Sequence, residues 1–322
     1  MSVTTNADVA VHVPVMLDQV VDALQPALNH PGAVLVDATV GLGGHSAALL
    51  DACPGARLVG IDRDGQALEL AAQRLARFDG RVELVRQRFD ALPEVLDGSG
   101  IKSADAILFD LGVSSLQIDD AGRGFAYSKD GPVDMRMDDR LAVDAATIVN
   151  TWPVADLTRI FRDYGEEPNA RRVAQAIADA RAAGPITSTS QLSGIVVGAM
   201  PAAIRFGDGG HPAKRVFQAL RITVNGELEA LGAALPLAFG RLASGGRIAV
   251  LSYHSLEDRL VKHAFADAVK DRAPRLLPIV PPELKPQFHI VGKPAQRPAD
   301  AEIALNRRAT SARLRTIEKE MT

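Results

Sequence analysis

Short apolar segments alternate with helical patterns along the first third of the chain, and this alternation restricts the possible folds more than any other feature. The apolar segments lie at residues 33–39, 57–62, 81–85 and 104–111, and residues 65–78 between the second and third have helical spacing. Apolar runs of this length are typical of strands buried on both faces. Strands that alternate with helices form βαβ units, whose strands are parallel. We therefore predict an α/β, doubly wound, Rossmann-like sheet.

The alternation stops after about residue 117, and residues 118–212 contain helical patterns without a convincing buried strand. These patterns cover residues 143–150, 154–164, 169–183 and 190–200. Helical patterns at 212–225 and 227–242 and an apolar strand at 247–253 then resume the α/β order. We predict one discontinuous domain of residues 1–117 and 213–322, interrupted by a mainly helical domain of residues 118–212.

Two predictions concern the C-terminal part of the chain. Residues 273–298 hold seven of the 19 prolines, so we expect an extended surface loop with little regular structure. Residues 312–317 alternate between apolar and polar side chains, and we expect them to form a final edge strand.

Composition excludes several classes of protein. The 322 residues include 36 basic and 39 acidic side chains, and the net charge of −3 excludes a strongly basic nucleic-acid-wrapping protein but not a local basic patch. Cys53 is the single cysteine, which excludes a disulfide framework and argues against a cysteine zinc site. The sequence has no membrane-length apolar run, and its polar start at Met1 to Asn6 lacks signal-peptide character. We expect a soluble cytoplasmic protein that needs no metal; the sequence does not indicate its oligomeric state.

A glycine-rich turn follows the first strand and forms the first candidate binding site. It contains Gly41, Gly43 and Gly44, and Asp62 ends the next strand 21 residues after Gly41. Glycine permits positive φ and close approach of a ligand to the backbone, and an acid at the second strand can accept hydrogen bonds from both hydroxyls of an adenosine ribose. A tight turn with a capping aspartate is the simpler alternative, and the pattern fits a nicotinamide dinucleotide almost as well as S-adenosylmethionine.

Two details favour S-adenosylmethionine over a dinucleotide. His45 and Ser46 stand where the dinucleotide fingerprint has its third glycine, which makes room for a pyrophosphate. Asp37 at the end of the first strand can orient the amino-acid end of a sulfonium cofactor. The pattern thus favours a cofactor that has no phosphate.

The fourth strand ends in Asp110, followed by Leu111, Gly112 and two serines after Val113. In a doubly wound sheet this end lies at the ligand-binding edge. A carboxylate there can accept a hydrogen bond from the amino group of an incoming base or help to hold a cofactor. The alternative is that Asp110 caps the turn through Ser114 or Ser115.

Polar residues farther along the chain are candidates for contact with a nucleic-acid substrate. Arg123 and Arg136 belong to a loop of alternating acids and bases, which is either a lid that offers them to phosphate or a charge-paired loop. The full set of candidates is Arg123, Arg136, Arg221, Asn225, His254, Arg308 and Arg313. Arg221 and Asn225 share a helix face, His254 is a possible base or RNA contact, and Arg308 and Arg313 belong to a run without acids. Structural or solvated roles are the alternatives.

The order of these motifs closely resembles the bacterial MraW (RsmH) family of small-subunit ribosomal RNA cytosine-N4 methyltransferases over about residues 12–318. The strings that carry the resemblance begin at His12 and include Asp37 to Ser46, Ile61 to Asp64, Asp110 to Ser115, Arg123 to Phe125, Asp134 to Asp138, Tyr164 to Glu167, Phe217 to Leu228 and His254 to Arg259. The resemblance implies a class I methyltransferase fold with an inserted helical domain. It also implies transfer of a methyl group from S-adenosylmethionine to N4 of a cytidine in the decoding region of 16S rRNA, with 16S rRNA or the small ribosomal subunit as partner.

The resemblance assigns cofactor contacts by motif. They are Gly43, Gly44, His45, Asp62, Phe89, Asp110 and Gln117. The sequence departs from the usual pattern at Leu116, where proline is usual, at Tyr253, where phenylalanine is usual, and at Asn306 to Thr310, where one arginine is missing.

The implied chemistry assigns one candidate catalytic residue. Cytosine N4 is a poor nucleophile because its lone pair is delocalised into the ring, so an acceptor near N4 favours the attacking form. Asp110 is the candidate, with backbone carbonyls after it as the alternative. The rival hypotheses are a nicotinamide-dependent oxidoreductase, a methyltransferase for DNA or protein, and a non-catalytic S-adenosylmethionine-binding RNA module.

Overall fold

The computed structural model describes residues 13–205, 210–271 and 285–321 of the chain. Its contacts divide these residues into two compact units. The sheet unit comprises Met1–Gly112 and Ala230–Thr322, and the helical unit comprises Val113–Glu229. His12 and residues 273–284 of the predicted proline-rich loop lie outside the described residues. The division of the chain into functional domains at residues 118 and 212 stays a prediction.

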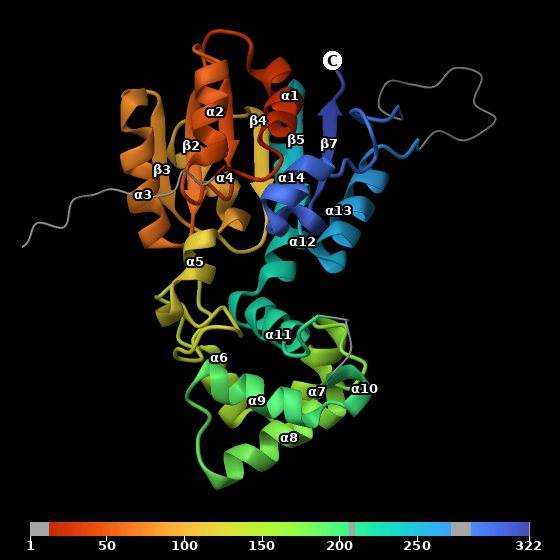
Figure 1. Ribbon diagram of the computed structural model, residues 1–322. Coiled ribbons are helices and arrows are strands. Elements are labelled where there is room, and N and C mark those ends of the chain that lie inside the picture. The colour runs from red at the N-terminus through yellow and green to blue at the C-terminus, as the bar shows by residue number, and fades with distance from the viewer. Residues whose placement is uncertain (1–12, 206–209, 272–284, 322) are drawn as a thin grey trace, which may run out of the picture. The chain divides into compact units, whose positions relative to one another are not determined.

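The sheet unit alternates helices and strands as the sequence predicts (Figure 1). Its elements are α1 (Leu17–Leu28), β1 (Val34–Asp37), α2 (Gly44–Ala52), β2 (Arg57–Asp62), α3 (Gly65–Leu75), β3 (Val82–Arg86), α4 (Leu92–Gly98), β4 (Ala104–Asp110), α12 (Glu227–Gly240), β5 (Leu242–Ser252), α13 (Ser255–Ala268), β6 (Phe288–Ile290), α14 (Asp300–Leu305) and β7 (Arg313–Lys319). α12 begins at the end of the helical unit and connects it to β5.

Among the described residues the strands form one sheet in the order β3-β2-β1-β4-β5-β7-β6. The strands β1 to β5 are parallel to one another, whereas β7 is antiparallel to both β5 and β6. The α/β doubly wound fold is therefore confirmed. The expectation that residues 312–317 form an edge strand is wrong, because the three residues of β6 pair with the outer side of β7. β6 also lies within the segment predicted to be irregular, and three residues between prolines are too few to show a periodic pattern.

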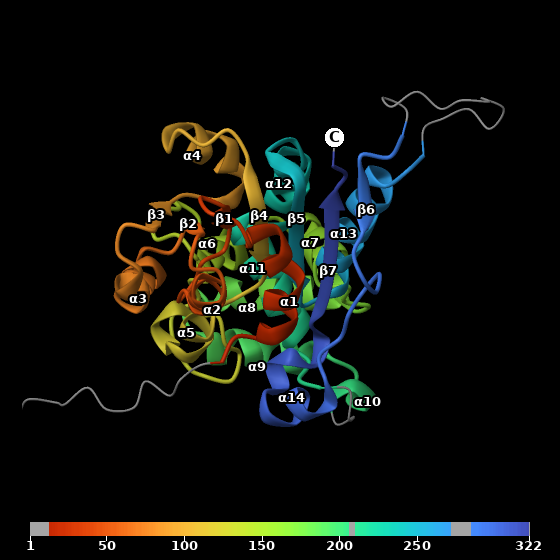
Figure 2. The ribbon, with the colours of Figure 1, turned by 90° about the horizontal axis from the view of Figure 1, so that it is seen from above.

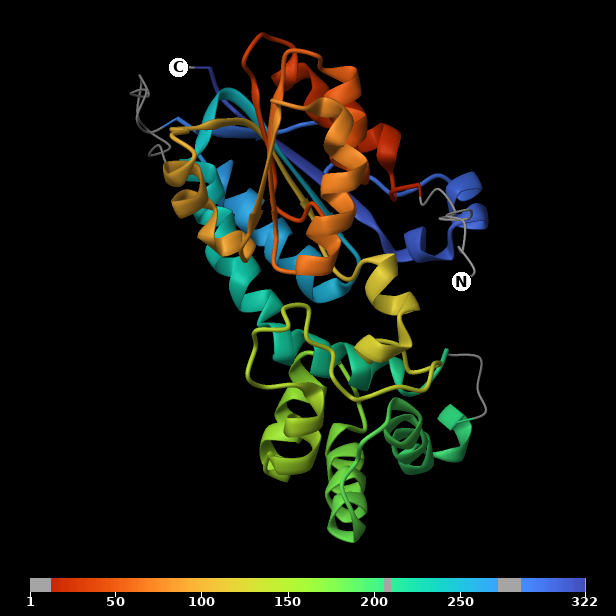
Figure 3. The same cartoon turned by 90° about the vertical axis from the view of Figure 1, so that its left-hand side faces the viewer.

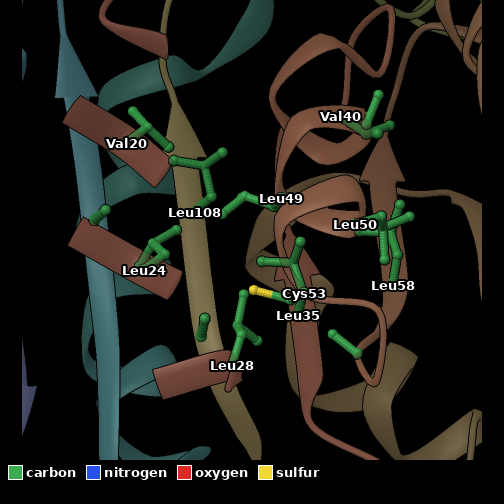
Figure 4. Packing of buried hydrophobic residues seen from close by; sticks show 14 of the residues in the cluster. Val20, Leu24, Leu28, Leu35, Val40, Leu49, Leu50, Cys53, Leu58 and Leu108 are labelled. Atoms are coloured by element: carbon green, nitrogen blue, oxygen red, sulfur yellow. The ribbon is translucent and has the colours of Figure 1, made fainter. Parts of the chain in front are cut away.

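Helices cover both faces of the sheet (Figures 2 and 3). On one face Leu35 of β1, Leu58 of β2 and Leu108 of β4 pack with α1 and α2 in one core cluster (Figure 4). α1 contributes Val20 and Leu24, four residues apart, so its apolar stripe faces the sheet. The neighbouring strand residues point to the opposite face, where a second cluster includes α4, α12 and α13. Burial on both faces explains why the strands are continuous apolar runs.

The helical unit has a hydrophobic core of its own. Its helices are α5 (Ser115–Asp119), α6 (Ala145–Thr151), α7 (Val154–Asp163), α8 (Ala170–Ala183), α9 (Thr189–Ala199), α10 (Ala202–Arg205) and α11 (Lys214–Asn225). The core includes Leu157, Phe161 and Ile177 together with Phe217 and Leu220 of α11. Because α11 packs with α6 and α7, the compact unit extends beyond residue 212.

Asn225, a predicted RNA contact, is buried at the end of α11 and holds the loop that contains Met135 and Met137. Its Nδ2 donates to the carbonyls of Met135 (2.8 Å) and Arg221 (2.9 Å). Its Oδ1 accepts from the backbone N–H of Met137 at 2.8 Å. Arg221 is also a predicted RNA contact. Its guanidinium forms a two-pronged ion pair with the Glu227 carboxylate, with both N–O distances 2.9 Å. Contact of either residue with RNA stays a prediction.

We expect Asn225→Ala to lower the free energy of unfolding by about 2–4 kcal/mol, because it leaves buried backbone groups without partners. Urea denaturation measures the change. Thr223→Ala is a matched control on the same helix, since the Thr223 hydroxyl donates to the Ala219 carbonyl one turn earlier and holds no other segment through that bond. Equal destabilisation by the two variants would contradict the structural role assigned to Asn225.

The part of the chain that the structure describes contains neither a membrane-crossing helix nor a metal-ligand cluster. No helix in residues 13–205, 210–271 or 285–321 combines the length and apolar character needed to cross a bilayer. The same residues contain no cluster of three or more His, Cys, Asp or Glu side chains placed to hold a metal ion.

Candidate active site

Three parallel strands of the sheet unit each end in an aspartate. Asp37 ends β1, Asp62 ends β2 and Asp110 ends β4. β1 lies between β2 and β4 in parallel register, so these carboxylates share the carboxyl edge of the sheet. Loops at this edge are where doubly wound folds bind their ligands.

Asp62 is fixed by the turn that follows β1. Its Oδ2 accepts from the backbone N–H of Gly41, and its Oδ1 accepts from that of Asp64, both at 2.9 Å. Burial raises the pKa of Asp62 above its ordinary value, although these two hydrogen bonds and the positive charge of Arg63 oppose the rise. Each carboxylate oxygen has a second lone pair, so the group can accept two further hydrogen bonds without moving.

Gly43 and Gly44 have no room for larger side chains. Gly43 has φ of 74°, a left-handed conformation that glycine adopts without strain, and α2 begins at the next residue. A Cβ on Gly44 would lie 2.5 Å from Cγ of Pro14. The backbone of this turn therefore depends on glycine at both positions.

Asp37 is buried beneath this turn. Its Oδ2 accepts from the Ser46 hydroxyl at 2.6 Å, and its Oδ1 accepts from the Thr39 N–H at 3.2 Å. Burial raises the pKa of Asp37 to about 6, against the opposing effects of Ser46 and His45. The folded protein therefore holds a proton on Asp37 at a pH where the unfolded chain has lost it.

This difference predicts a pH dependence of stability. Between pH 4 and 6 the folded state binds more protons than the unfolded state, so Asp37 lowers the free energy of unfolding as pH rises, by about 3 kcal/mol in all. We expect Asp37→Asn to remove this decline, measured by urea unfolding from pH 4 to 7. Asp22→Asn, at an exposed site on α1, is the control. A wild-type slope retained in Asp37→Asn would refute the assignment.

His45 lies between two acceptors. Its Nε2 is 3.0 Å from the Val15 carbonyl, and its Nδ1 is 3.3 Å from Oδ2 of Asp110. Burial lowers the pKa of His45, but the hydrogen bond and charge of Asp110, with the charge of Asp37, outweigh burial and raise it above the ordinary value. Both ring nitrogens face oxygens that accept, so the geometry favours the doubly protonated imidazolium.

Asp110 is held through its backbone as well as its side chain. Its N–H donates to the Thr39 hydroxyl at 2.6 Å, and its Oδ1 accepts from the Tyr253 hydroxyl at 2.7 Å. About a quarter of the side chain (27%) remains exposed, so the carboxylate can still be reached from solvent. Phe89 follows β3, half-buried, with its ring edge-on to Phe109 at 5.8 Å between centroids.

The structure brings most predicted cofactor residues together in the sheet unit. Gly43, Gly44, His45, Asp62 and Asp110 share the carboxyl edge, and Phe89 follows a strand that ends there. Gln117 belongs to the helical unit, where it completes a capping box with Ser114 at the start of α5. The cofactor roles of these residues stay predictions.

The predicted RNA contacts are placed differently from one another. Arg123 donates to the carbonyls of Arg136 and Met137, and Arg136 forms a two-pronged ion pair with Asp134. His254 caps α13 by accepting from the Glu257 N–H. Near the C-terminus, Nε of Arg313 lies 3.9 Å from Oδ2 of Asp258, and the Arg308 side chain is exposed. The charge-paired alternative thus describes the loop of Arg123 and Arg136 in this structure, and the RNA roles stay predictions.

Sequence reasoning did not assign roles to the hydroxyl groups that hold the site. Thr39 holds the backbone of Asp110, Ser46 holds Asp37, and Tyr253 holds the Asp110 carboxylate. Thr39 and Ser46 lie within the glycine-turn motif, and Tyr253 directly follows the fifth strand. Their positions next to strand ends were the signal in the sequence that could have indicated such roles. Their hydrogen-bond partners come from other segments of the chain and are seen only in the three-dimensional structure.

Comparison with known proteins identifies the family. The model of the MraW methylase family matches residues 9–320. The chain belongs to this family. The resemblance inferred from the motifs is confirmed. The sheet order of this chain, with antiparallel β7, agrees with the class I methyltransferase fold that the resemblance implies.

Curated members of the MraW methylase family match almost the whole chain. The chain is 56% identical over 309 residues to ribosomal RNA small subunit methyltransferase H of Acidothermus cellulolyticus, covering 96% of this chain and 94% of the relative. It is 54% identical over 308 residues to the protein of the same name from Thermobifida fusca, covering 96% and 93%. The protein of that name from Streptomyces avermitilis is 52% identical over 308 residues, covering 96% of each chain.

Proposed function

We propose that this chain transfers a methyl group from S-adenosylmethionine to the N4 amino group of a cytidine in the decoding region of 16S rRNA. The observation that carries the proposal is the set of carboxylates of Asp37, Asp62 and Asp110 at one edge of the sheet. Membership of the MraW methylase family, with curated relatives named as small-subunit rRNA methyltransferases, supports the reaction and the substrate. A ribosomal substrate places the enzyme in the cytoplasm.

The chemistry of this edge fits a sulfonium cofactor. S-adenosylmethionine carries a positive sulfonium and a positive amino group, which carboxylates stabilise, whereas the pyrophosphate of a dinucleotide would be repelled by the same groups. Asp62 keeps lone pairs for two ribose hydroxyls, and the half-buried ring of Phe89 offers an apolar surface for adenine. When bound, the cofactor supplies an electrophilic methyl carbon.

The residues of this chain contribute mainly by positioning. Asp110 accepts a hydrogen bond from the N4 amine, which favours the form with a localised lone pair and stabilises positive charge on nitrogen. Tyr253 holds the carboxylate of Asp110 for this role, and Thr39 holds its backbone N–H. A target cytosine has to leave its stack to reach this partly exposed acceptor at the sheet edge, which favours an unpaired or flipped base.

We further propose that the helical unit contributes to RNA binding. α8 carries Arg171 and Arg172, which are exposed and line a cavity of about 670 Å³ with Asn169 and Gln175. Exposed arginines beside amide side chains suit phosphate and sugar contacts. Such a local patch accommodates RNA despite the net charge of −3.

The test of the proposed function is deletion of the gene followed by mass spectrometry of 16S rRNA. We expect N4-methylcytidine to be lost and to return when the wild-type gene, but not Asp110→Ala, is supplied. Unchanged N4-methylcytidine would refute the substrate assignment.

Calorimetry separates this function from the rival hypotheses. NADH binding without S-adenosylmethionine binding would indicate an oxidoreductase. Binding of S-adenosylmethionine without rRNA methylation would indicate a non-catalytic module or another substrate.

A further inference from the structure

Tyr253 and Asp110 come from neighbouring strands of the sheet unit. Asp110 ends β4, and Tyr253 directly follows β5. The two strands are parallel, and Asp110 pairs in register with Leu251, two residues before the tyrosine. This register brings the two side chains to the same side of the sheet edge.

The tyrosine hydroxyl is the donor in the contact between them. Its Oη lies 2.7 Å from Oδ1 of Asp110. Burial, followed by the negative charge of Asp110, raises the pKa of Tyr253 well above its ordinary value, so the hydroxyl keeps its proton at neutral pH. A neutral donor bonded to a charged acceptor makes one of the stronger hydrogen bonds in proteins.

Tyr253 is itself fixed in place. Its backbone N–H donates at 2.8 Å to Oε2 of Glu257, a buried residue in the first turn of α13. The ring also packs near the backbone after β4, since a Cβ on Gly112 would lie 3.4 Å from Cδ2 of the ring, an ordinary van der Waals distance. The hydroxyl is therefore presented to Asp110 by a rigid support.

The rest of Asp110 is held by two other groups. His45 Nδ1 lies 3.3 Å from its Oδ2, and the Thr39 hydroxyl accepts from its backbone N–H. Tyr253 restrains Oδ1, the other carboxylate oxygen, whereas the contact of His45 is with Oδ2. With both oxygens restrained, the carboxylate has one orientation rather than several.

We propose that Tyr253 is a positioning residue that fixes the orientation of the Asp110 carboxylate for methyl transfer. The inference rests on the proposed function, and it adds a residue that acts on the reaction through Asp110. Phenylalanine at this position preserves the ring and removes only the hydroxyl. The Tyr253→Phe variant therefore keeps the packing against Gly112 while releasing Oδ1.

The experiment measures methylation of small ribosomal subunits lacking the modification, with S-adenosylmethionine as methyl donor. We expect Tyr253→Phe to lower kcat about 5- to 20-fold, in line with loss of one hydrogen bond to a charged group, and to leave the KM for S-adenosylmethionine within two-fold. In the Asp110→Ala background the same change should alter kcat less than two-fold, because the group that Tyr253 orients is absent.

Tyr164→Phe is a matched control. The Tyr164 hydroxyl also donates to a carboxylate, Oε1 of Glu229, at 2.6 Å within the helical unit. We expect this variant to leave kcat and cofactor affinity unchanged. Unfolding midpoints of all variants are measured in parallel to identify loss of folded enzyme.

Two results would overturn the inference. One is a Tyr253→Phe enzyme with kcat within two-fold of wild type, and the other is an undiminished effect in the Asp110→Ala background, which would show that Tyr253 acts independently of Asp110. An inactive wild-type enzyme that still binds S-adenosylmethionine would instead refute the proposed rRNA substrate, and the inference with it.

Discussion

Replacement of Asp62 by alanine is expected to lower the affinity for S-adenosylmethionine at least about 100-fold. Two hydrogen bonds from ribose hydroxyls to a charged carboxylate contribute about 1.5–3 kcal/mol each, and 1.4 kcal/mol corresponds to a tenfold change. The variant also removes the acceptor for the Gly41 N–H, so the glycine turn loses its link to β2. Both effects act on the same binding site, and both weaken it.

Isothermal titration calorimetry measures this loss directly. Asp64→Ala is the matched control, because Asp64 lies two residues away and caps α3 by accepting from the Gln66 N–H at 3.1 Å. Loss of the cap costs about 1 kcal/mol of stability, but we expect it to change cofactor affinity only a few-fold. Equal affinities of Asp62→Ala and wild type would remove Asp62 from the cofactor site.

The second large effect is expected at Asp110. We expect Asp110→Ala to lower kcat by about 10²–10³, the range found when a group that stabilises transition-state charge is removed. Asp110→Asn keeps the shape of the side chain and isolates the effect of its charge. Single-turnover methylation of small ribosomal subunits at saturating cofactor measures the chemical step separately from binding.

A variant of the same strand provides the control. Asp105 lies at the amino end of β4, where its Oδ2 accepts from the Val34 N–H at 2.7 Å. Asp105→Ala should reduce stability without changing kcat of the folded enzyme. If Asp110→Ala retained kcat within three-fold of wild type, a backbone carbonyl after β4 would become the better candidate acceptor.

The sequence predicted the parts of the fold that have a strong periodic signal. β1, β2 and β4 are buried on both faces, and their sequences are mostly apolar. Gly43 in the turn after β1 and Asp62 at the end of β2 indicate the edge of the sheet where the candidate site lies. α1 was not predicted, although its apolar face packs against β4 and β5. Strand β6 was also missed, since three residues that pair with β7 are stabilised by their partner strand rather than by a local preference.

Long-range partners could not be read from the sequence. The contact of Tyr253 with Asp110 joins residues 143 positions apart, and that of Asn225 with Met135 joins residues 90 positions apart. The sequence indicated that Arg221 and Asn225 share a helix face, but it did not show that the face would be occupied by other parts of the chain. Residue type and spacing locate candidate groups, whereas the tertiary structure decides whether their hydrogen-bonding capacity is used internally.

The position of the helical unit in the chain has a consequence for folding. β4, α12 and β5 form a parallel βαβ unit, and the helical unit stands in place of the short loop that normally joins strand to helix. Closing an unfolded loop of more than 100 residues rather than about five costs about 3 kcal/mol of additional chain entropy. If the helical unit forms its own core first, most of this chain entropy has already been lost before β5 pairs with β4. Pairing of the two central strands is therefore expected to be the late step of folding, and it is the step that joins Tyr253 to Asp110.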